Sequence, residues 1–240
     1  MVYMGSKNRH ANELLNIILK YRKPEQYYVE PFVGGFNMID KVTGNRIAND
    51  SNFYLIELFK SIINGYIPPK QITEFEYDNI KCNKENYPPC LVGFVGFCCS
   101  YSGKFFGGYA RGKNNKGLER NYCLERFNNL IKQKDSLIGC EIYNLNYKDL
   151  IIPKNSIIYC DPPYANTTGY SSKFNHDEFW DWCRKQKFNG HDIYISEYHA
   201  PNDFTPIWEK KVNNSLTKDT GSKVGIEKLF VYKNLKEIHG

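Results

Sequence analysis

The sequence has none of the patterns that would place it in a membrane or in the secretory pathway. Its longest apolar run, residues 90–99, is interrupted by glycines and falls short of the roughly 18 residues that a membrane helix needs. The first ten residues are polar and contain no hydrophobic core of a signal peptide. We therefore expect a cytoplasmic protein that does not act at a membrane.

Metal-ligand patterns are also missing. The eight cysteines are spread along the chain, and no CxxC or HExxH pair occurs. Without an export signal, cysteines at such spacing favour reduced thiols over a disulfide framework. The five histidines have no partner pattern either, so the sequence predicts no metal site.

The chain has the composition of an ordinary globular protein, and it contains one basic segment. Its 240 residues are 41% hydrophobic and 24% charged, which is sufficient for one large core. Between residues 98 and 134, eight basic residues outnumber two glutamates, so this segment alone matches the net charge of +6. Glycines and aromatic residues are interleaved with these cations, a mixture suited to phosphate contact and base stacking, although a solvated basic loop is the alternative.

Hydrophobic periodicity predicts alternating strands and helices. Short apolar runs bounded by turn residues predict strands, and apolar residues three or four apart predict helices. This alternation favours an α/β fold with a parallel sheet and right-handed crossovers. The predicted strands are 27–32, 46–48, 141–145, 156–160 and 192–196, with a closing antiparallel pair at 207–212 and 228–233, and the predicted helices lie within 3–20, after Gly35, and at 53–63, 71–81, 119–137 and 177–187.

The character of the chain changes between residues 66 and 118. Proline pairs, a polar helix and a Gly-rich basic stretch replace the regular alternation there. The pair Pro88-Pro89 follows no apolar strand and is interpreted as a loop. We therefore predict a main domain of residues 1–65 and 119–240 and an inserted lobe of residues 66–118.

The most distinctive motif is Asp161-Pro162-Pro163-Tyr164, which directly follows the apolar strand 156–160. In an open α/β sheet, ligands bind beyond the carboxyl ends of the strands. Two consecutive prolines fix a stiff turn that directs a carboxylate and a backbone carbonyl at one point, and the Tyr164 ring is placed to stack on a planar substrate. The alternative is a Pro-Pro turn with an N-capping Asp.

A second motif, Glu30-Pro31-Phe32-Val33-Gly34-Gly35, follows the predicted strand 27–32. Its glycines allow the backbone to approach a cofactor closely, and Asp50 follows the next strand at a spacing that suits ribose hydroxyls. Phe36 interrupts any GxGxxG pattern, so the sequence does not predict a dinucleotide site.

Taken together, these residues resemble the Dam-like DNA adenine methyltransferases, in particular phage-type members. Tyr3-Met4-Gly5-Ser6-Lys7 resembles the family's opening Gly-Lys loop, residues 30–35 its S-adenosylmethionine loop, and residues 161–164 its catalytic DPPY motif. Asp50 is similar to its ribose-binding carboxylate, and the segments 105–111 and 196–198 are also similar. The order of these motifs is that of the alpha group, and the resemblance spans nearly the whole chain.

The resemblance implies a Rossmann-like S-adenosylmethionine-dependent methyltransferase sheet in which residues 66–118 form the target-recognition lobe. It implies S-adenosylmethionine as the cofactor and double-stranded DNA as the partner, and we expect a monomer in solution. The implied site comprises catalytic Asp161, Pro162 and Tyr164; cofactor-binding Tyr3, Lys7, Glu30, Pro31, Phe32, Gly34, Gly35, Asp50, Asn146, Tyr147 and Asp161; and DNA-contacting Lys104, Arg111, Lys113, Lys116 and Arg120.

This sequence departs from the family pattern at two positions. Phe36 stands where many members have a third glycine, and Asn146 stands where many have an Asp. An uncharged Asn146 makes a weaker hydrogen bond to the cofactor's adenine than a carboxylate does. Both departures therefore concern the affinity for the cofactor.

The mechanism that the resemblance implies localises the lone pair of an adenine amino group. Asp161 and the Pro162 carbonyl accept the two amino hydrogens of a base flipped from the duplex, and Tyr164 stacks on that base. Lys7 meets the methionine carboxylate or the extruded nucleotide, and the loop 165–173 orders over the base.

Two alternatives of other kinds stay open. One is a methyltransferase of another amino group, in cytosine, RNA or a protein glutamine. The other is a non-catalytic nucleic-acid-binding protein.

Overall fold

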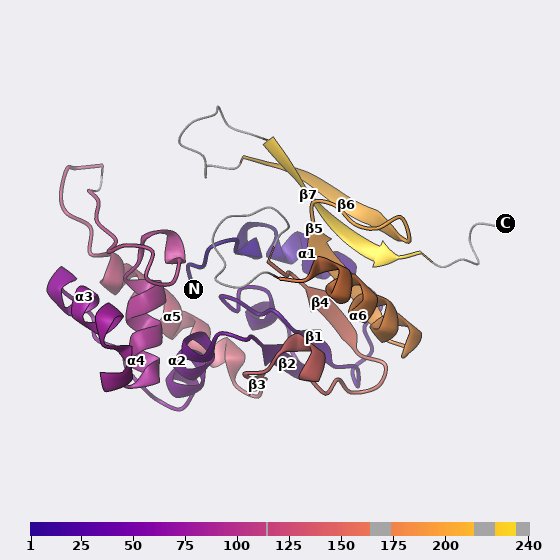
Figure 1. Ribbon diagram of the computed structural model, residues 1–240, viewed down its shortest axis with the longest axis horizontal. Coiled ribbons are helices and arrows are strands. Elements are labelled where there is room, and N and C mark those ends of the chain that lie inside the picture. Colours follow the sequence, from indigo (N-terminus) through magenta and orange to yellow (C-terminus); the bar gives the residue numbers. More distant parts are fainter. Residues whose placement is uncertain (114, 164–173, 214–223, 234–240) are drawn as a thin grey trace.

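The computed structural model describes residues 1–113, 115–163, 174–213 and 224–233, which form an α/β fold around one mixed sheet (Figure 1). The strand order is β3-β2-β1-β4-β5-β7-β6. Strands β1 to β5 pair in parallel, and β7 pairs antiparallel with both β5 and β6. The strands are β1 (Tyr28–Glu30), β2 (Arg46–Asn49), β3 (Glu141–Tyr143), β4 (Ile157–Cys160), β5 (Asp192–Glu197), β6 (Phe204–Asn213) and β7 (Val224–Tyr232).

The strand order confirms the predicted Rossmann-like sheet with a closing antiparallel pair at one edge. Every residue of β1, β2 and β4 is buried, as expected for central strands covered on both faces. The chain runs outward from β1 to β2 and β3, and in the other direction from β4 to β5. The order therefore reverses between β1 and β4, which is the switch point where ligands bind in folds of this kind.

Alternate residues of the central strands enter two separate hydrophobic cores. In β1 the ring of Tyr28 joins one core and Val29 joins the other. In β4 Tyr159 and Cys160 divide in the same way, because successive side chains of a strand point to opposite faces. The first core is covered by α1 (Ala11–Ile18), α2 (Phe53–Ile63) and α5 (Tyr122–Lys134), and the second by α6 (His176–Phe188).

Side-chain caps determine where several helices begin. Asn52, Asn121 and Asn175 precede α2, α5 and α6, and each accepts a hydrogen bond from the backbone amide three residues later. Thr73 and Glu76 form a reciprocal capping box at the start of α3 (Glu74–Cys82). These local signals explain why the predicted helices 53–63 and 177–187 agree closely with the structure.

Two sequence-based expectations about local structure are wrong. Pro88-Pro89 was expected to form a loop, but Pro89 begins the helix α4 (Pro89–Gly93), since the first turn of a helix tolerates the fixed backbone angle and missing N–H of proline. After Gly35 the structure has only the 3₁₀ turn η2 (Ile39–Lys41) in place of a helix. Phe36 adopts a positive φ of 58°, a conformation incompatible with a right-handed helix.

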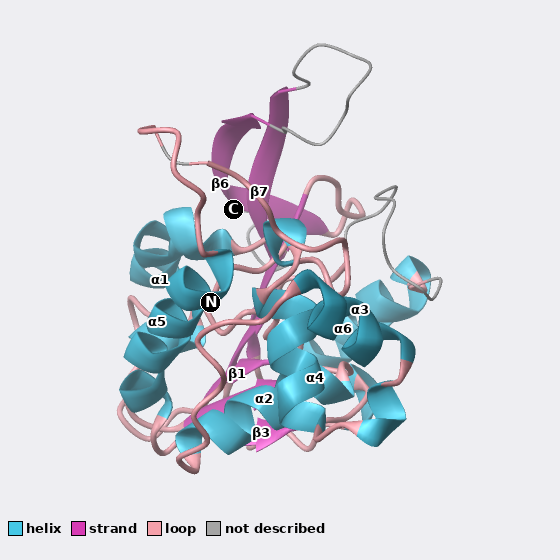
Figure 2. Cartoon of the chain, turned by 90° about the vertical axis from the view of Figure 1, so that its left-hand side faces the viewer, coloured by secondary structure: helices cyan, strands magenta, loops and turns pink. Residues whose placement is uncertain are grey.

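The helix α4 and the π-helical turn η4 (Phe94–Cys98) pack into the first core against α2. Val92, Phe94, Val95 and Phe97 are all buried there. Part of the segment 66–118 therefore shares a core with the main domain, while its assignment as an inserted lobe remains a prediction. In Figure 1 the helix α4 lies between α2 and α3, and in Figure 2 the β6–β7 pair stands above the helices.

The close crossing of α2 and α4 depends on Gly93. A Cβ atom at this position would collide with the backbone carbonyl oxygen of Tyr54 and lie 3.1 Å from Leu58 Cβ. Gly93→Ala is therefore expected to lower the free energy of unfolding by about 1–3 kcal/mol, although alanine has the higher helix propensity. Urea unfolding measures this effect, with Cys90→Ala as the matched change in the same helix. A more stable Gly93→Ala protein would mean that the two helices are not in close contact.

Candidate active site

The ends of three neighbouring strands bring the main candidate residues together. The loop 30–35 leaves the carboxyl end of β1, Asp50 follows β2, and Asp161 follows β4. Because β2, β1 and β4 are adjacent and parallel, these ends meet at one edge of the sheet. This edge lies at the switch point, where the sequence placed the site.

Asp50 is bound directly to the glycine loop. Its Oδ2 accepts a hydrogen bond of 3.1 Å from the Gly34 amide, and its Oδ1 accepts one of 2.9 Å from the Asn52 amide. Burial raises the pKa of Asp50 above its usual value, although both amide donors oppose that effect. The Asp50 carboxylate therefore lies beside the glycine loop and also holds the backbone of that loop in place.

The two glycines also admit the ring of Tyr3. A Cβ at Gly34 would lie 2.8 Å from the Tyr3 ring, and one at Gly35 would lie 2.7 Å from Tyr3 Cβ. Gly34 has a φ of +49°, which strains any other residue. The opening loop and the glycine loop are thus packed against each other, a contact that the sequence motifs did not reveal.

Phe36, which follows the two glycines, has a glycine-like backbone conformation. Its φ is 58°, and its fully buried ring stacks on Phe59 of α2 with the ring centroids 3.9 Å apart. Stacking and burial of the ring offset the strain of the positive φ. The packing of the ring therefore stabilises the bend of the loop at Phe36.

Lys7 lies between two carboxylates contributed by distant parts of the chain. Its Nζ is 3.0 Å from Asp161 Oδ1 and 3.7 Å from Glu227 Oε1, and its side chain is only 4% exposed. Burial by itself lowers the pKa of Lys7, but Asp161 and Glu227 outweigh burial and hold this pKa above its usual value. Glu227 carried no sequence signal, because it lies in a strand far from every motif.

Glu30 is a buried acid at the end of β1. The residue is 2% exposed, and no group in the described part of the chain forms a hydrogen bond with its Oε1. Burial raises its pKa well above the usual value, with Asp40 and Asp161 adding to this effect. The surroundings therefore favour the neutral form of this side chain over the charged form.

Asn146 and Tyr147 also reach the site region. Asn146 Oδ1 accepts a hydrogen bond of 3.1 Å from the Lys148 amide and caps the 3₁₀ turn η7 (Tyr147–Asp149), a role that an Asp also performs. The Tyr147 ring packs against Phe32 of the glycine loop at 5.0 Å between centroids and against Trp182 of α6 at 5.2 Å. Phe32 and Tyr147 thus form an aromatic wall beside the ends of the strands.

The five candidate DNA-contacting residues, Lys104, Arg111, Lys113, Lys116 and Arg120, are all exposed. Arg111 pairs with Glu74 of α3, and Arg120 pairs with Glu125 at 3.0 Å. Arg126, counted in the basic segment, is buried and donates to the carbonyls of Cys98, the last residue of η4, and of Ser100. It therefore does not add to the basic surface.

The remaining expectations concern the residues after Asp161, metal sites, membrane helices and the cysteines. Pro162 is described and buried, whereas Tyr164 and the loop 165–173 lie outside the described residues. In the described ranges, no group of three or more His, Cys, Asp or Glu converges as a metal site, and no helix is long and apolar enough to cross a membrane. All eight cysteines belong to those ranges and are free thiols.

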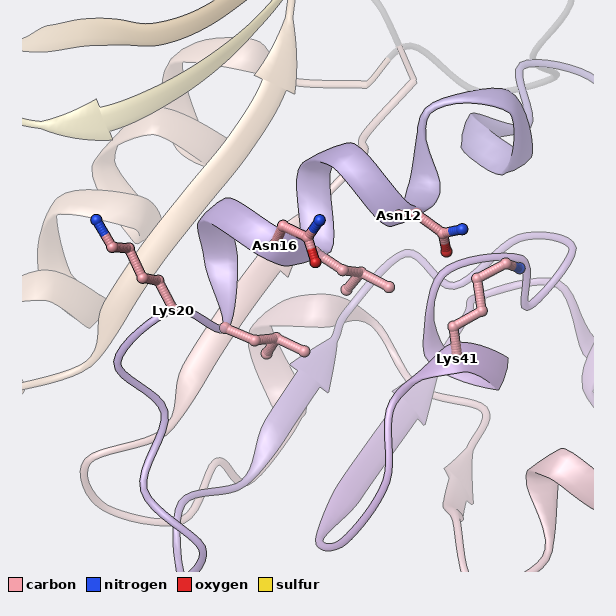
Figure 3. A pocket seen from close by; sticks show the side chains of 6 residues that line it. Asn12, Asn16, Lys20 and Lys41 are labelled. Atoms are coloured by element: carbon pink, nitrogen blue, oxygen red, sulfur yellow. The ribbon is translucent and has the colours of Figure 1, made fainter.

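A separate hollow of about 340 Å³ lies between α1 and η2 (Figure 3). It is lined by Asn12, Leu15, Asn16, Leu19, Lys20 and Lys41, none of which is a candidate site residue. Its polar lining consists of amides and lysines. It contributes no carboxylate, thiol or imidazole to acid–base chemistry.

Comparison with known proteins finds similarity to methyltransferases. Residues 3–89 match the model of the D12 class N6 adenine-specific DNA methyltransferases. The resemblance expected from the sequence is confirmed for this segment, which contains Lys7, the glycine loop and Asp50, but not Asp161.

The chain is also 26% identical over 252 residues to the type II methyltransferase M.FokI of Planomicrobium okeanokoites. That match covers 88% of this chain and 38% of M.FokI, so the chain spans less than half the length of this curated relative. Among solved structures, the tRNA (m1A58) methyltransferase TrmI from Aquifex aeolicus matches with a TM-score of 0.37 at 9% identity, covering 94% of this chain and 70% of TrmI. The putative methyltransferase SMU.472, complexed with SAH, matches with a TM-score of 0.39 at 9% identity over 95% of this chain and 52% of its own.

The raised pKa of Glu30 generates a prediction about stability. The folded protein keeps a proton that the unfolded chain releases above about pH 4.3, so the free energy of unfolding falls as pH rises from there toward the folded pKa. Glu30→Gln removes this loss, because its side chain stays neutral. Urea unfolding should therefore show similar stabilities of the two proteins near pH 4 and a growing advantage for Glu30→Gln as the pH rises toward the folded pKa of Glu30. Exposed Glu25→Gln is the control, and parallel pH curves for Glu30→Gln and the unsubstituted protein would contradict burial as the cause.

Proposed function

We propose that this protein transfers a methyl group from S-adenosylmethionine to the exocyclic amino group of a flipped adenine in duplex DNA. The observation that carries the proposal is the placement of Asp161 at the carboxyl end of β4, 3.0 Å from buried Lys7 and beside the glycine loop. The family match over residues 3–89 and the similarity to a type II methyltransferase support the same reaction.

The residues at the ends of the strands fit S-adenosylmethionine, which supplies an electrophilic methyl group when bound. Asp50 offers a carboxylate at the glycine loop for ribose hydroxyls, and the Phe32–Tyr147 wall suits a purine ring. Glu30 has a buried oxygen without a hydrogen-bond partner among the described residues, which suits a cationic part of the cofactor. These are the residues that would hold it.

Asp161 and the Pro162 carbonyl perform the chemistry on the amino group. The nitrogen lone pair of adenine is delocalised into the ring, so the enzyme must localise it before it attacks. Lys7 occupies one oxygen of Asp161, Oδ1, which leaves Oδ2 to accept an amino hydrogen. The carboxylate then also offsets the positive charge that develops on the nitrogen.

The exposed basic residues of the segment 98–134 form the proposed contact surface for DNA phosphates. Lys104, Lys113 and Lys116 lie on it, with Arg111 and Arg120 held by neighbouring glutamates. Phosphate contacts of this kind position a duplex without reading its sequence. We assign target recognition to the lobe 66–118 and expect the protein to be a monomer in solution.

Transfer of labelled methyl from S-adenosylmethionine to unmethylated duplex DNA tests the proposal, with nuclease digestion to identify the modified nucleoside. We expect N6-methyladenine. Methylcytosine, or label found only in RNA or protein, would replace adenine by another amino group. Absence of both transfer and cofactor binding would favour a non-catalytic nucleic-acid-binding protein.

Asp161→Ala should lower turnover by at least about 100-fold, because it removes the hydrogen-bond acceptor that localises the lone pair. Binding of labelled cofactor should remain within a few-fold, because Asp50 and the aromatic wall are intact. Asp192→Ala, an exposed carboxylate at the start of β5, is the control and should keep full activity. Retained methylation in Asp161→Ala would refute the assigned role.

The basic surface generates a prediction about salt. Replacing Lys113 and Lys116 by Gln should lower the slope of log Kd against log salt for duplex DNA by up to about 0.9 for each lost phosphate contact. Lys20→Gln with Lys23→Gln removes the same charge from exposed positions outside this segment and serves as the control. If both double variants have the same slope of log Kd against log salt, the DNA phosphates contact another surface of the protein.

A further inference from the structure

Lys7 joins three parts of the chain that are far apart in sequence. It lies in the 3₁₀ turn η1 (Lys7–Arg9), while its partners Asp161 and Glu227 belong to the end of β4 and to β7. Its Nζ also donates to the Gly5 carbonyl at 3.3 Å. Asp161 has a role in the proposed reaction, but nothing in that reaction yet explains Glu227.

The packing of β7 directs Glu227 toward the first core. Glu227 is two residues before Leu229, which is fully buried in that core, so both side chains point to the same face of the sheet. Across the ladder, Glu227 is paired with Lys210 of β6. A carboxylate therefore reaches Lys7 from a strand whose neighbouring positions are fixed by packing.

The edge of the sheet is anchored to the helix that follows η1. Glu13 of α1 accepts hydrogen bonds from Trp208 Nε1 at 2.7 Å and from Lys210 Nζ at 2.6 Å. The Trp208 ring also lies 5.9 Å from that of His10, which directly follows η1. These contacts hold β6 against α1 and His10. Because β6 is paired with β7, they also limit the distance between Glu227 of β7 and Lys7 of η1.

The cluster of Lys7, Asp161 and Glu227 contains one cationic and two acidic side chains. One ammonium group, almost without solvent, faces two carboxylates whose side chains are 22% and 17% exposed, Asp161 and Glu227 respectively. When Asp161 engages a substrate amino group, its charge is partly taken up by that group. A second carboxylate then keeps the buried ammonium compensated, since an isolated buried charge is costly.

We propose that Glu227 is a positioning residue that holds Lys7 charged and aligned against Asp161. Its consequence for catalysis rests on the proposed methyl transfer, whereas its effect on Lys7 does not. The charged and titratable groups around Lys7 are Asp161 from β4, Glu227 from β7 and Tyr198 after β5, with Lys210 opposite Glu227 on β6. Of the two carboxylates, Glu227 can be neutralised while the proposed catalytic carboxylate, Asp161, is left unchanged.

The first test measures Lys7 itself. In protein labelled with ¹³C-lysine, the Cε resonance of Lys7 is assigned by its loss in Lys7→Met and followed through an alkaline titration. Glu227→Gln should move the Lys7 titration to lower pH, because a carboxylate that raises the Lys7 pKa is removed. The control is Glu209→Gln, which takes the same charge from an exposed pair with Lys228 on the same two strands and should leave the titration unchanged.

The second test measures methyl transfer in the same variants. Glu227→Gln should lower kcat by about tenfold or more with little change in the KM for cofactor, and should move the alkaline limb of the rate profile to lower pH. Glu227→Asp, which keeps the charge, should recover part of kcat. A variant that merely folds poorly would lose kcat without moving this limb, and Glu209→Gln should match the unsubstituted protein.

The two tests separate the inference from the function on which it rests. A shifted Lys7 titration without methyl transfer in any variant would refute the proposed function and leave the contact of Glu227 with Lys7 intact. An unshifted titration in folded Glu227→Gln would overturn the inference, whatever the activity. Normal kcat and pH profile in Glu227→Gln, with active unsubstituted protein, would overturn the positioning role.

Discussion

The ion pair between Lys7 and Asp161 links the opening loop of the chain to the central strand β4. A buried ammonium is stable only beside negative charge, so its position requires the end of β4 and β7 to lie where they do. The antiparallel pair at the edge of the sheet is thereby part of the site. Its contacts with Glu13 of α1 keep that edge aligned with the turn that carries Lys7.

Close packing rather than charge organises the other half of the site. Tyr3 fits against Gly34 and Gly35 only because neither has a Cβ, and the same loop is bound to Asp50 through a backbone amide. Phe36 adopts a positive φ at the bend after these glycines, and its ring stacks on Phe59. The opening loop thus touches both halves, through Tyr3 in one and Lys7 in the other.

Local patterns in the sequence were sufficient to predict the parallel sheet, the edge pair and the strand ends that carry Asp50 and Asp161. These features follow from alternation and from side chains close in sequence. Glu227 was missed because its partner is 220 residues away, and no periodicity encodes a contact across the sheet. Arg126 was counted with the basic segment because charged side chains are usually exposed, whereas this one is buried and donates to backbone carbonyls.

The carboxyl groups of the candidate site have different surroundings. Asp161 and Glu227 share the ammonium of Lys7, whereas burial raises the pKa of Glu30 well above its usual value. Two carboxylates against one lysine give the Lys7 cluster a formal net negative charge, and a cation bound beside Glu30 would lower the raised pKa of that carboxyl. A sulfonium cofactor brings such a cation, so the balance of charge favours the ligand that the proposed reaction requires.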